Sequence, residues 1–549
     1  MRVIDAISEI LKREGVEYIP CFPTTPVIEA AAGAGIRPVI CRQERVGVGI
    51  ADGFARVTNG RPPGVFAMQY GPGAENAFSG IATAYSDSVP MLVLPLGHPI
   101  ERAGISPHFN SRRVYDPVTK SVEEVNTGER VSEIMRRAFS TLKMGRPGPV
   151  MVEIPADIAL QEVDESASLY QPVKVTRSAA NSRDIDQVAR VLLEARSPVI
   201  QAGQGVMYAE ATAELKQLAE LLQVPVMTTL AGKSSFPEDH PLSLGTGAAT
   251  SAGAVVQFVG KADVIFGIGT SFTKHGMTLT IPPGKVMIQA TNDDRDINKD
   301  YSIDYPIIGD AKLVLGQLIE AVKDRLGSNS RDGDGTVARD VKAAKDVWLG
   351  EWMPKLTSDE VPMTPYRVIW ELMQTVDPAD AIVTHDSGSP RDQMVPFYRS
   401  SVPRSYLGWG KSHGLGTGLG LAIGAKLAAP DKLAIHWMGD AAFGMVGLDF
   451  ETAVRSNLPI LAIVSNNSTM AAETRAMPIS HELYKTRDLG GNYADMATAM
   501  GGYAERVENP SEISPAIQRA RKATENGQAA LLEFITCEET AASHRRAFG

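Results

Sequence analysis

Residues 432–467 read KLAIHWMGDAAFGMVGLDFETAVRSNLPILAIVSNN, and this stretch decides the fold class. An apolar run ends in Gly439 and Asp440, a helix-forming segment follows, and a second apolar run ends in Asn466 and Asn467. Apolar strands joined through a helix are typical of parallel sheets that are covered on both faces. Because parallel strands end at the same edge of a sheet, we expect Asp440 and Asn467 to leave the sheet at one edge.

The same alternation of apolar strands and helices runs along the chain in three segments. It predicts an α/β protein with three doubly wound parallel-sheet domains, over residues 1–165, 185–325 and 360–549. Polar or glycine-rich stretches at 164–184 and 327–335 are expected to be linkers. The predicted strands are 16–22, 37–42, 62–69, 90–97, 148–155, 197–203, 224–229, 262–269, 285–290, 305–310, 381–386, 432–440, 458–467 and 529–537.

Composition excludes several classes of protein. The 549 residues carry a net charge of −10, so the electrostatic footprint of a nucleic-acid binder is absent. Three cysteines cannot build a disulfide framework, which makes a reducing cytoplasm the expected location. The N-terminus has helical periodicity interrupted by acidic residues and is not expected to be a signal peptide, and no apolar stretch is long enough to span a membrane.

Asp440 and Asn467 form the first candidate site. A carboxylate, an amide oxygen and a nearby backbone carbonyl are the hard oxygen ligands that Mg²⁺ prefers, and diphosphate oxygens could complete its coordination. The alternative is that both residues only cap the turns that follow their strands.

A second candidate site lies in the N-terminal segment. Glu44 follows the strand at 37–42 and opens a helix, where the helix dipole favours a carboxylate. Gly71-Pro72-Gly73 turns tightly into another helix that carries Asn76 in its first turns. Taken alone, these features also fit an ordinary acidic helix start and an ordinary strand-to-helix turn.

Together the motifs carry a resemblance. Glu44 with its helix, GPGAENAFSGIATAY at 71–85, GRPGPVMVEIPAD at 145–157 and GDA followed after 24 residues by Asn466-Asn467 occur in this order in one family. The chain resembles the thiamine-diphosphate (ThDP) enzymes of the acetolactate synthase type over all three domains, which that family calls pyrimidine-binding, central and diphosphate-binding. The resemblance implies ThDP and Mg²⁺ as cofactors and a homo-oligomer, dimer or tetramer, whose active sites lie between subunits.

The resemblance also implies residue roles. Glu44 would be the catalytic acid that hydrogen-bonds the aminopyrimidine ring of the cofactor, an arrangement that suits a proton relay. Asp440, Asn467 and the Thr469 carbonyl would hold Mg²⁺, and Leu415 would wedge the cofactor into a bent conformation. The full set of implied cofactor contacts is Thr25, Pro26, Asn76, Gly388, Ser389, His413, Leu415, Gly439, Asp440, Ala441, Ala442, Asn467, Thr469 and Met470.

Local motifs favour one branch of this family. Arg42-Gln43-Glu44 and the stretch GDAAFG at 439–444 are similar to 2-hydroxyacyl-CoA lyases and oxalyl-CoA decarboxylases. The favoured function is therefore a ThDP-dependent C–C lyase or carboligase that acts on a small acyl-CoA. The alternative is an acetolactate-synthase-like carboligase of free 2-oxo acids. A third possibility is a non-catalytic ThDP-binding paralogue, against which the presence of Glu44, Asp440 and Asn467 together argues.

Substrate and nucleotide contacts are also expected. Phe109 and Asn110 fall near the family's substrate side, and Ser543, Arg545 and Arg546 would close over a CoA chain unless the C-terminus is only a frayed basic tail. The central domain could bind ADP, whereas the synthases' Arg-Phe-Asp motif reads Ser271-Phe272-Thr273 here, which weakens the case for FAD. Candidates for proton shuttling, or simply for structural hydrogen bonds, are His98, His108 and His413.

Overall fold

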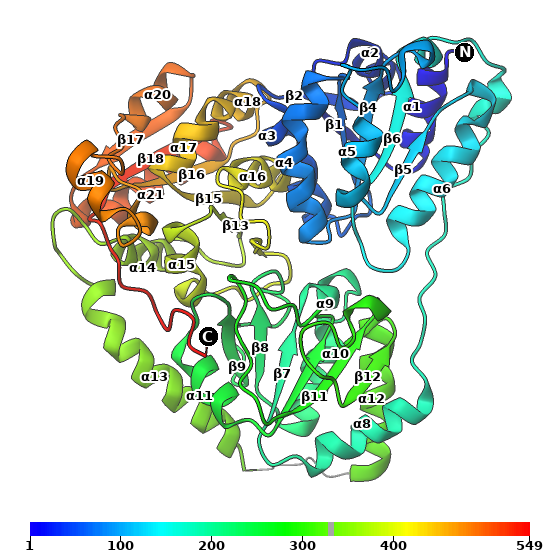
Figure 1. Cartoon of the computed structure of the whole chain (residues 1–549). Helices are drawn as coiled ribbons and strands as arrows, with labels where there is room; N and C mark the ends of the chain where they lie inside the picture. Colours follow the sequence, from blue (N-terminus) through cyan, green and yellow to red (C-terminus); the bar gives the residue numbers. More distant parts are fainter. Residues whose placement is uncertain (328–333, 549) are drawn as a thin grey trace.

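The computed structural model describes residues 1–327 and 334–548, which form three α/β domains arranged around a common centre (Figure 1). Of the linker predicted at 327–335, residues 328–333 lie outside the described residues. The other predicted linker contains a short 3-10 helix, Glu165–Ser168, and then runs without helix or strand until residue 182. No helix in these described ranges is long and apolar enough to cross a membrane.

Each domain is built on a six-stranded sheet in which all strands are parallel, as the sequence predicted. The strand orders are β2-β1-β3-β4-β6-β5, β12-β11-β10-β7-β8-β9 and β14-β13-β15-β16-β18-β17. The strands are β1 Tyr18–Phe22, β2 Arg37–Ile40, β3 Gly64–Met68, β4 Met91–Gly97, β5 Ser121–Glu124, β6 Val150–Pro155, β7 Pro198–Ala202, β8 Val226–Thr229, β9 Ser243–Gly247, β10 Val264–Ile268, β11 Val286–Thr291, β12 Tyr305–Ile308, β13 Ala381–His385, β14 Tyr406–Leu407, β15 Leu433–Gly439, β16 Leu461–Asn466, β17 Tyr503–Val507 and β18 Ala530–Ile535.

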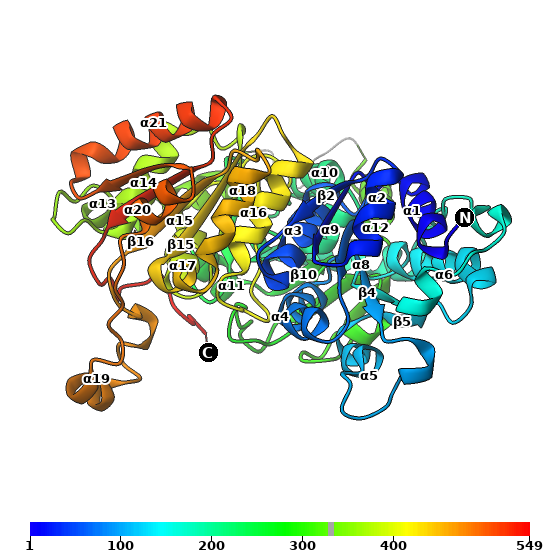
Figure 2. The ribbon, with the colours of Figure 1, turned by 90° about the horizontal axis from the view of Figure 1, so that it is seen from above.

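Helices cover both faces of each sheet (Figures 1 and 2). The α-helices are α1 Val3–Arg13, α2 Thr25–Gly33, α3 Glu44–Val57, α4 Pro72–Ser86, α5 Ser111–Tyr115, α6 Val131–Lys143, α7 Ala156–Ala159, α8 Ser182–Glu194, α9 Gln204–Tyr208, α10 Thr212–Leu222, α11 Gly253–Lys261, α12 Ala311–Leu326, α13 Thr336–Leu356, α14 Pro365–Thr375, α15 Ser389–Phe397, α16 Thr417–Ala428, α17 Asp440–Val446, α18 Phe450–Arg455, α19 Pro478–Tyr484, α20 Tyr493–Ala499 and α21 Ile513–Glu525.

The sequence prediction missed four strands, all of them at or beside a sheet edge. β5 (SVEE) and most of β17 (YAERV) are half-buried and polar, and β14 has only two residues. β9 (SLGTG) is buried but rich in glycine, which is depleted in strands. Edge strands lack the continuous apolar run by which a central strand is recognised, because one of their sides faces no neighbouring strand.

The topology fixes where ligands can bind. Counted within each domain, the first and third sheets share the strand order 2-1-3-4-6-5. The second strand lies on one side of the first strand and the third strand on its other side, so the order of the strands reverses between the first and third strands. Counted within its own domain, the central sheet has the order 3-2-1-4-5-6, which is typical of dinucleotide-binding folds. In such sheets the crevice for a ligand opens at the carboxyl ends of the two strands that flank the reversal.

Helices α3 and α16 join the first and third domains through glycine-lined faces. A Cβ atom on Gly49 would lie 3.1 Å from Gly420 Cα, and one on Gly420 would lie 2.6 Å from the Val46 carbonyl oxygen. A Cβ atom on Gly53 would overlap the Leu421 carbonyl group. The two backbones therefore touch directly, and apolar side chains of both helices share one buried cluster.

Gly53→Ala should destabilise the protein by about 1–3 kcal/mol, because the new methyl group has only rigid backbone to displace. Gly316→Ala is the matched control: Gly316 lies inside α12 with no atom near its missing Cβ, so alanine there should stabilise the protein by about 0.5–1 kcal/mol. Urea unfolding of both variants measures the difference. Equal stabilities of the two variants would contradict the close contact.

Candidate functional site

The crevice of the third sheet lies between the ends of β13 and β15. Gly388 and Ser389 follow β13, and Gly439 and Asp440 end β15 and open α17. The two turns are adjacent, since a Cβ atom on Gly439 would lie 3.4 Å from Pro390 Cγ. Gly388 has a φ of +80° and open space beside its Cα, so its backbone is accessible in a conformation that only glycine adopts freely.

Asp440 has an unsatisfied buried oxygen. Its carboxylate Oδ1 accepts the Ala441 N–H at 2.7 Å, whereas Oδ2 is buried and has no hydrogen-bond partner among the described residues. Burial raises the pKa of Asp440, while backbone N–H groups of the loop after β16 oppose that shift. A buried carboxylate oxygen without a partner is costly unless a cation or a donor completes it.

The loop after β16 lies against Asp440. Asn467 Oδ1 accepts the Thr469 N–H at 3.1 Å, and Met470 donates its N–H to the Arg487 carbonyl at 2.9 Å. No group of three or more His, Cys, Asp or Glu side chains in the described part of the chain could hold a metal ion. The oxygens of Asp440, the Asn467 amide and the Thr469 carbonyl are instead the donor set that this crevice offers, and they suit Mg²⁺. Ala441 and Ala442 form the first turn of α17 beside it.

The crevice of the first sheet holds Glu44. Its side chain is 3% exposed, burial raises its pKa, and Asn76 Nδ2 donates a hydrogen bond to Glu44 Oε2 at 3.3 Å. Thr25 and Pro26 form the first turn of α2 after β1, at the same edge of the sheet. The Thr24 hydroxyl beside them is buried and has no partner among the described residues.

The loop between β14 and α16 carries His413 and Leu415. Asp386, which is fully buried, accepts the N–H groups of Gly416 at 2.8 Å and Gly418 at 3.2 Å. From the first domain, Arg45 of α3 donates a hydrogen bond to the Leu415 carbonyl oxygen. His413 is exposed, and its ring lies 5.9 Å from that of His275 in the central domain.

The structure does not bring all the predicted residues together within one chain. No hydrogen bond or ion pair among the described residues joins Glu44 to Asp440 or Asn467. The ring centroids of His98 and His108 lie 4.4 Å apart with the rings tilted by 39°, and His98 Nε2 is buried without a hydrogen-bond partner among the described residues. Asn110 caps α5 by accepting a hydrogen bond from the Arg113 N–H. Phe109 packs against a buried apolar cluster of the first domain.

The C-terminal tail is bound to the protein. Ser543 is 1% exposed, and its hydroxyl accepts the Trp348 Nε1–H at 2.8 Å and donates to the Ser251 carbonyl at 2.7 Å. Arg545 pairs with Asp392 at 2.7 Å, and Phe548 packs on the apolar cluster of the central and third domains. The tail is therefore held in place and is not the frayed basic tail that was the alternative. Of Ser543, Arg545 and Arg546, only Arg546 has no side-chain partner in the described ranges.

Two cavities adjoin these sites. One of about 520 Å³ lies between the tail, residues 471–476 and the start of α15, and it is lined by Ser389 and Arg475. The other, of about 300 Å³, lies where the three domains meet, at the reversal of the central sheet. Sequence reasoning missed the residue that enters this second cavity from the third domain, Lys411; a lone lysine in the glycine-rich stretch GWGKSHGLG is the only signal of it.

Two doubly wound domains share one topology, with a buried acid at the sheet edge of the first and a set of oxygen donors at the sheet edge of the third. This arrangement is the one that the resemblance to enzymes that use ThDP implies. The comparisons agree with this class. Residues 1–120 match the thiamine pyrophosphate enzyme N-terminal TPP binding domain, residues 185–318 the central domain and residues 386–534 the C-terminal TPP binding domain. The chain belongs to the thiamine pyrophosphate enzyme family, and within it to the acetolactate synthase type.

Curated relatives match along most of their length. The chain is 30% identical to the "probable acetolactate synthase large subunit" of Methanocaldococcus jannaschii, with 95% of this chain and 90% of the relative covered. It is 31% identical to the acetolactate synthase large subunit of Corynebacterium glutamicum (97% and 86% covered). It is 26% identical to the glyoxylate carboligase of Escherichia coli O157:H7 (95% and 90% covered).

Ser543→Ala should lower the free energy of unfolding by about 1–3 kcal/mol, because it leaves the Trp348 N–H and the Ser251 carbonyl without their buried partner. Ser178→Ala is the control, since Ser178 is exposed and its hydroxyl makes no hydrogen bond in the described ranges. Thermal unfolding of the two variants measures the effect. If Ser543→Ala were as stable as the control, the tail would not be bound as described.

Proposed function

We propose that this protein is a ThDP- and Mg²⁺-dependent carboligase that acts on free 2-oxo acids. The observation that carries the choice of substrate is the bound tail: Ser543 and Arg545, which were expected to close over a CoA chain, already have partners within the protein. The names of the relatives, acetolactate synthase and glyoxylate carboligase, favour the same choice. The acyl-CoA lyase that the sequence motifs favoured becomes the second candidate.

Bound ThDP supplies the nucleophilic carbon and the electron sink that C–C bond formation and cleavage require. Asp440, Asn467 and the Thr469 carbonyl would hold Mg²⁺, and the backbone at Gly388 and Ser389 would contact the diphosphate. The unsatisfied Oδ2 of Asp440 supports this assignment, because a cation there would give the buried carboxylate its missing partner.

Glu44 would hold a proton at its carboxylate against the aminopyrimidine ring. Its raised pKa supports this role, because an acid whose pKa lies closer to neutrality exchanges a proton more readily with a weak base. Asn76 would keep the carboxylate oriented. His413 and Leu415 would contact the same ring, while His98, His108, Phe109 and Asn110 would lie on the substrate side.

We propose a dimer as the active unit, in which Glu44 of one copy faces the Asp440 crevice of the other. The absence of any hydrogen bond or ion pair between Glu44 and Asp440 or Asn467 among the described residues is compatible with this arrangement. We also propose that the three-domain cavity binds a nucleotide such as ADP. The strand order of the central sheet and the volume of the cavity, about 300 Å³, support a nucleotide there.

With ThDP and Mg²⁺, the protein should consume pyruvate and form 2-acetolactate, detected as acetoin after acidification. Glu44→Gln should lower this turnover by about two to four orders of magnitude, the usual effect of losing a general acid–base group. Glu75→Gln, an exposed acid on the neighbouring helix α4, should leave it unchanged. Cleavage of 2-hydroxyacyl-CoA without any consumption of pyruvate would establish the second candidate instead.

Asp440→Asn should abolish Mg²⁺-dependent binding of ThDP, because an uncharged amide cannot hold a hard dication against water. The isosteric change leaves the size of the side chain intact, so the thermal stability of the cofactor-free protein should stay close to wild type. Calorimetric titration of ThDP with and without Mg²⁺ measures the effect, with the exposed Asp431→Asn as control. Unchanged ThDP affinity in Asp440→Asn would remove Asp440 from the metal site.

A further inference from the structure

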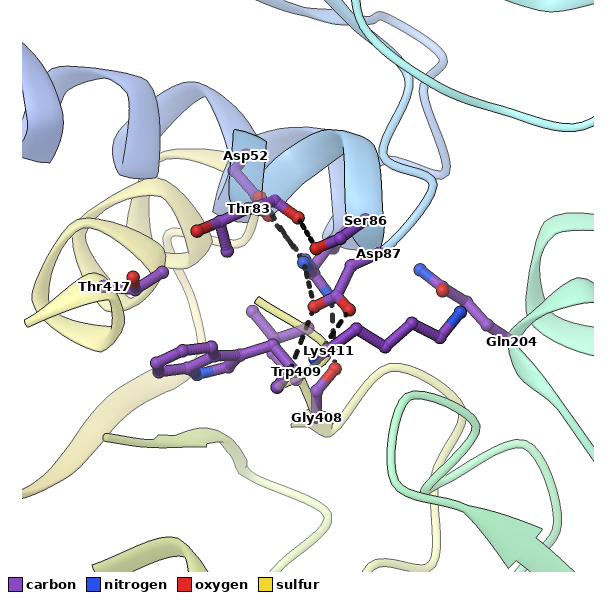
Figure 3. A network of polar contacts seen from close by, with 12 residues as sticks. Asp52, Thr83, Ser86, Asp87, Gln204, Gly408, Trp409, Lys411 and Thr417 are labelled. Carbon is purple, nitrogen blue, oxygen red and sulfur yellow. Dashed lines mark hydrogen bonds and ion pairs between the residues drawn. The ribbon is translucent and has the colours of Figure 1, made fainter. Parts of the chain in front are cut away.

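Lys411 reaches from the third domain into the cavity at the junction of the three domains. It lies in the loop between β14 and α16 and lines the cavity of about 300 Å³. In Figure 3 its side chain extends away from the loop toward Gln204 at the start of α9 in the central domain. No hydrogen bond or ion pair among the described residues involves its ammonium group.

Each of the other cations that line the cavity lies within ion-pair distance of a carboxylate. Arg146 pairs with Asp296 at 2.7 Å, and Arg61 with Glu210 at 3.6 Å. Two further cations of the lining have carboxylate partners: Lys143 with Glu14, and Arg177 with Asp310. Lys411 is therefore the one cation of this lining without a carboxylate partner in the described ranges.

Lys411 is half-buried, so its unpaired charge is partly removed from water. Desolvation lowers the pKa of Lys411, and Arg146 and Lys299 act in the same direction, against the attraction of Asp87 and Asp296. Asp87 itself is engaged elsewhere, because it accepts hydrogen bonds from Arg56 at 3.2 Å and from the Gly410 N–H at 3.2 Å. An anionic ligand in the cavity would supply the missing partner.

Hydrogen bonds from the first domain hold the backbone around Lys411, and Figure 3 shows this network of polar contacts. Asp87 accepts the Gly410 N–H, and Arg56 donates to the Gly408 carbonyl at 3.0 Å. His413 and Leu415 follow in the same loop. A ligand that binds the Lys411 side chain is therefore attached to the loop that would contact the aminopyrimidine ring of ThDP.

We propose that Lys411 is an anion-binding residue that holds a phosphate group of a ligand in the three-domain cavity, and that this ligand and ThDP strengthen each other's binding through the loop 408–416. A lysine ammonium at a cavity wall binds phosphate as a point charge. The inference rests on the proposed nucleotide site and names its ionic contact. The phosphate could belong to a nucleotide or to a free polyanion, and the ligands tested below separate these sources.

Calorimetry without ThDP should show that ADP binds the wild-type protein and that Lys411→Met weakens binding about tenfold or more, the loss expected for one charge-assisted contact. Lys411→Arg should stay within a few-fold of wild type, because the charge is kept. Arg61→Met, which removes a half-exposed and already paired cation from the same cavity, should have little effect. Pyrophosphate binding as tightly as ADP would identify a free polyanion, and weaker binding a nucleotide; both support the role of Lys411.

A second readout tests the coupling. ADP should raise the affinity of the wild-type protein for ThDP several-fold, and thermodynamic reciprocity requires ThDP to raise the affinity for ADP by the same factor. Lys411→Met should lose this coupling but keep its ThDP affinity in the absence of ADP. Equal ADP binding by wild type and Lys411→Met, or no binding of ADP or pyrophosphate by the wild type, would overturn the inference. Neither result depends on turnover of pyruvate, so failure of the proposed carboligase activity is observed separately.

Discussion

The direct backbone contact between α3 and α16 is the constraint on which the rest of the structure depends. Glycines at the crossing let two helices from different domains approach until their backbones touch. Glu44 is the first residue of α3, and Leu415 lies two positions before the first residue of α16. The crossing therefore sets where both residues lie, and any ligand contact they make inherits its geometry from the close approach of the two helix backbones.

Buried acids from two domains hold the loop before α16. Asp386 binds the backbone of Gly416 and Gly418 from within the third domain, and Asp87 binds the backbone of Gly410 from the first. A loop so rich in glycine loses much conformational entropy on folding and has few side chains with which to pack. Carboxylates that accept its N–H groups supply the order that its own residues lack.

Much of the fold could be predicted from the sequence, because central parallel strands are continuous apolar runs. The edge strands could not, since SVEE and YAERV have the polarity of loops and are recognised only by their pairing. In the candidate site, the positions of Glu44 and Asp440 at the sheet edges could be predicted, because each residue opens a helix shortly after a strand. Lys411 was not, because its cavity is walled by three domains whose relative placement no local pattern encodes. The anchoring of the tail was missed for the same reason: the partners of Ser543 lie about two to three hundred residues away.

The first and third domains share one strand order, and this has a consequence for how the chain can change over time. α3 follows the second strand of its domain and α16 follows the second strand of its own, so the two helices in contact are topological counterparts. The chain thus contains an internal pair of like units that meet through the same element. Because backbone faces backbone at this crossing, no smaller residue on one helix can make room for a side chain on the other. The glycines of both helices must therefore be kept together, although more than 350 residues separate the two helices.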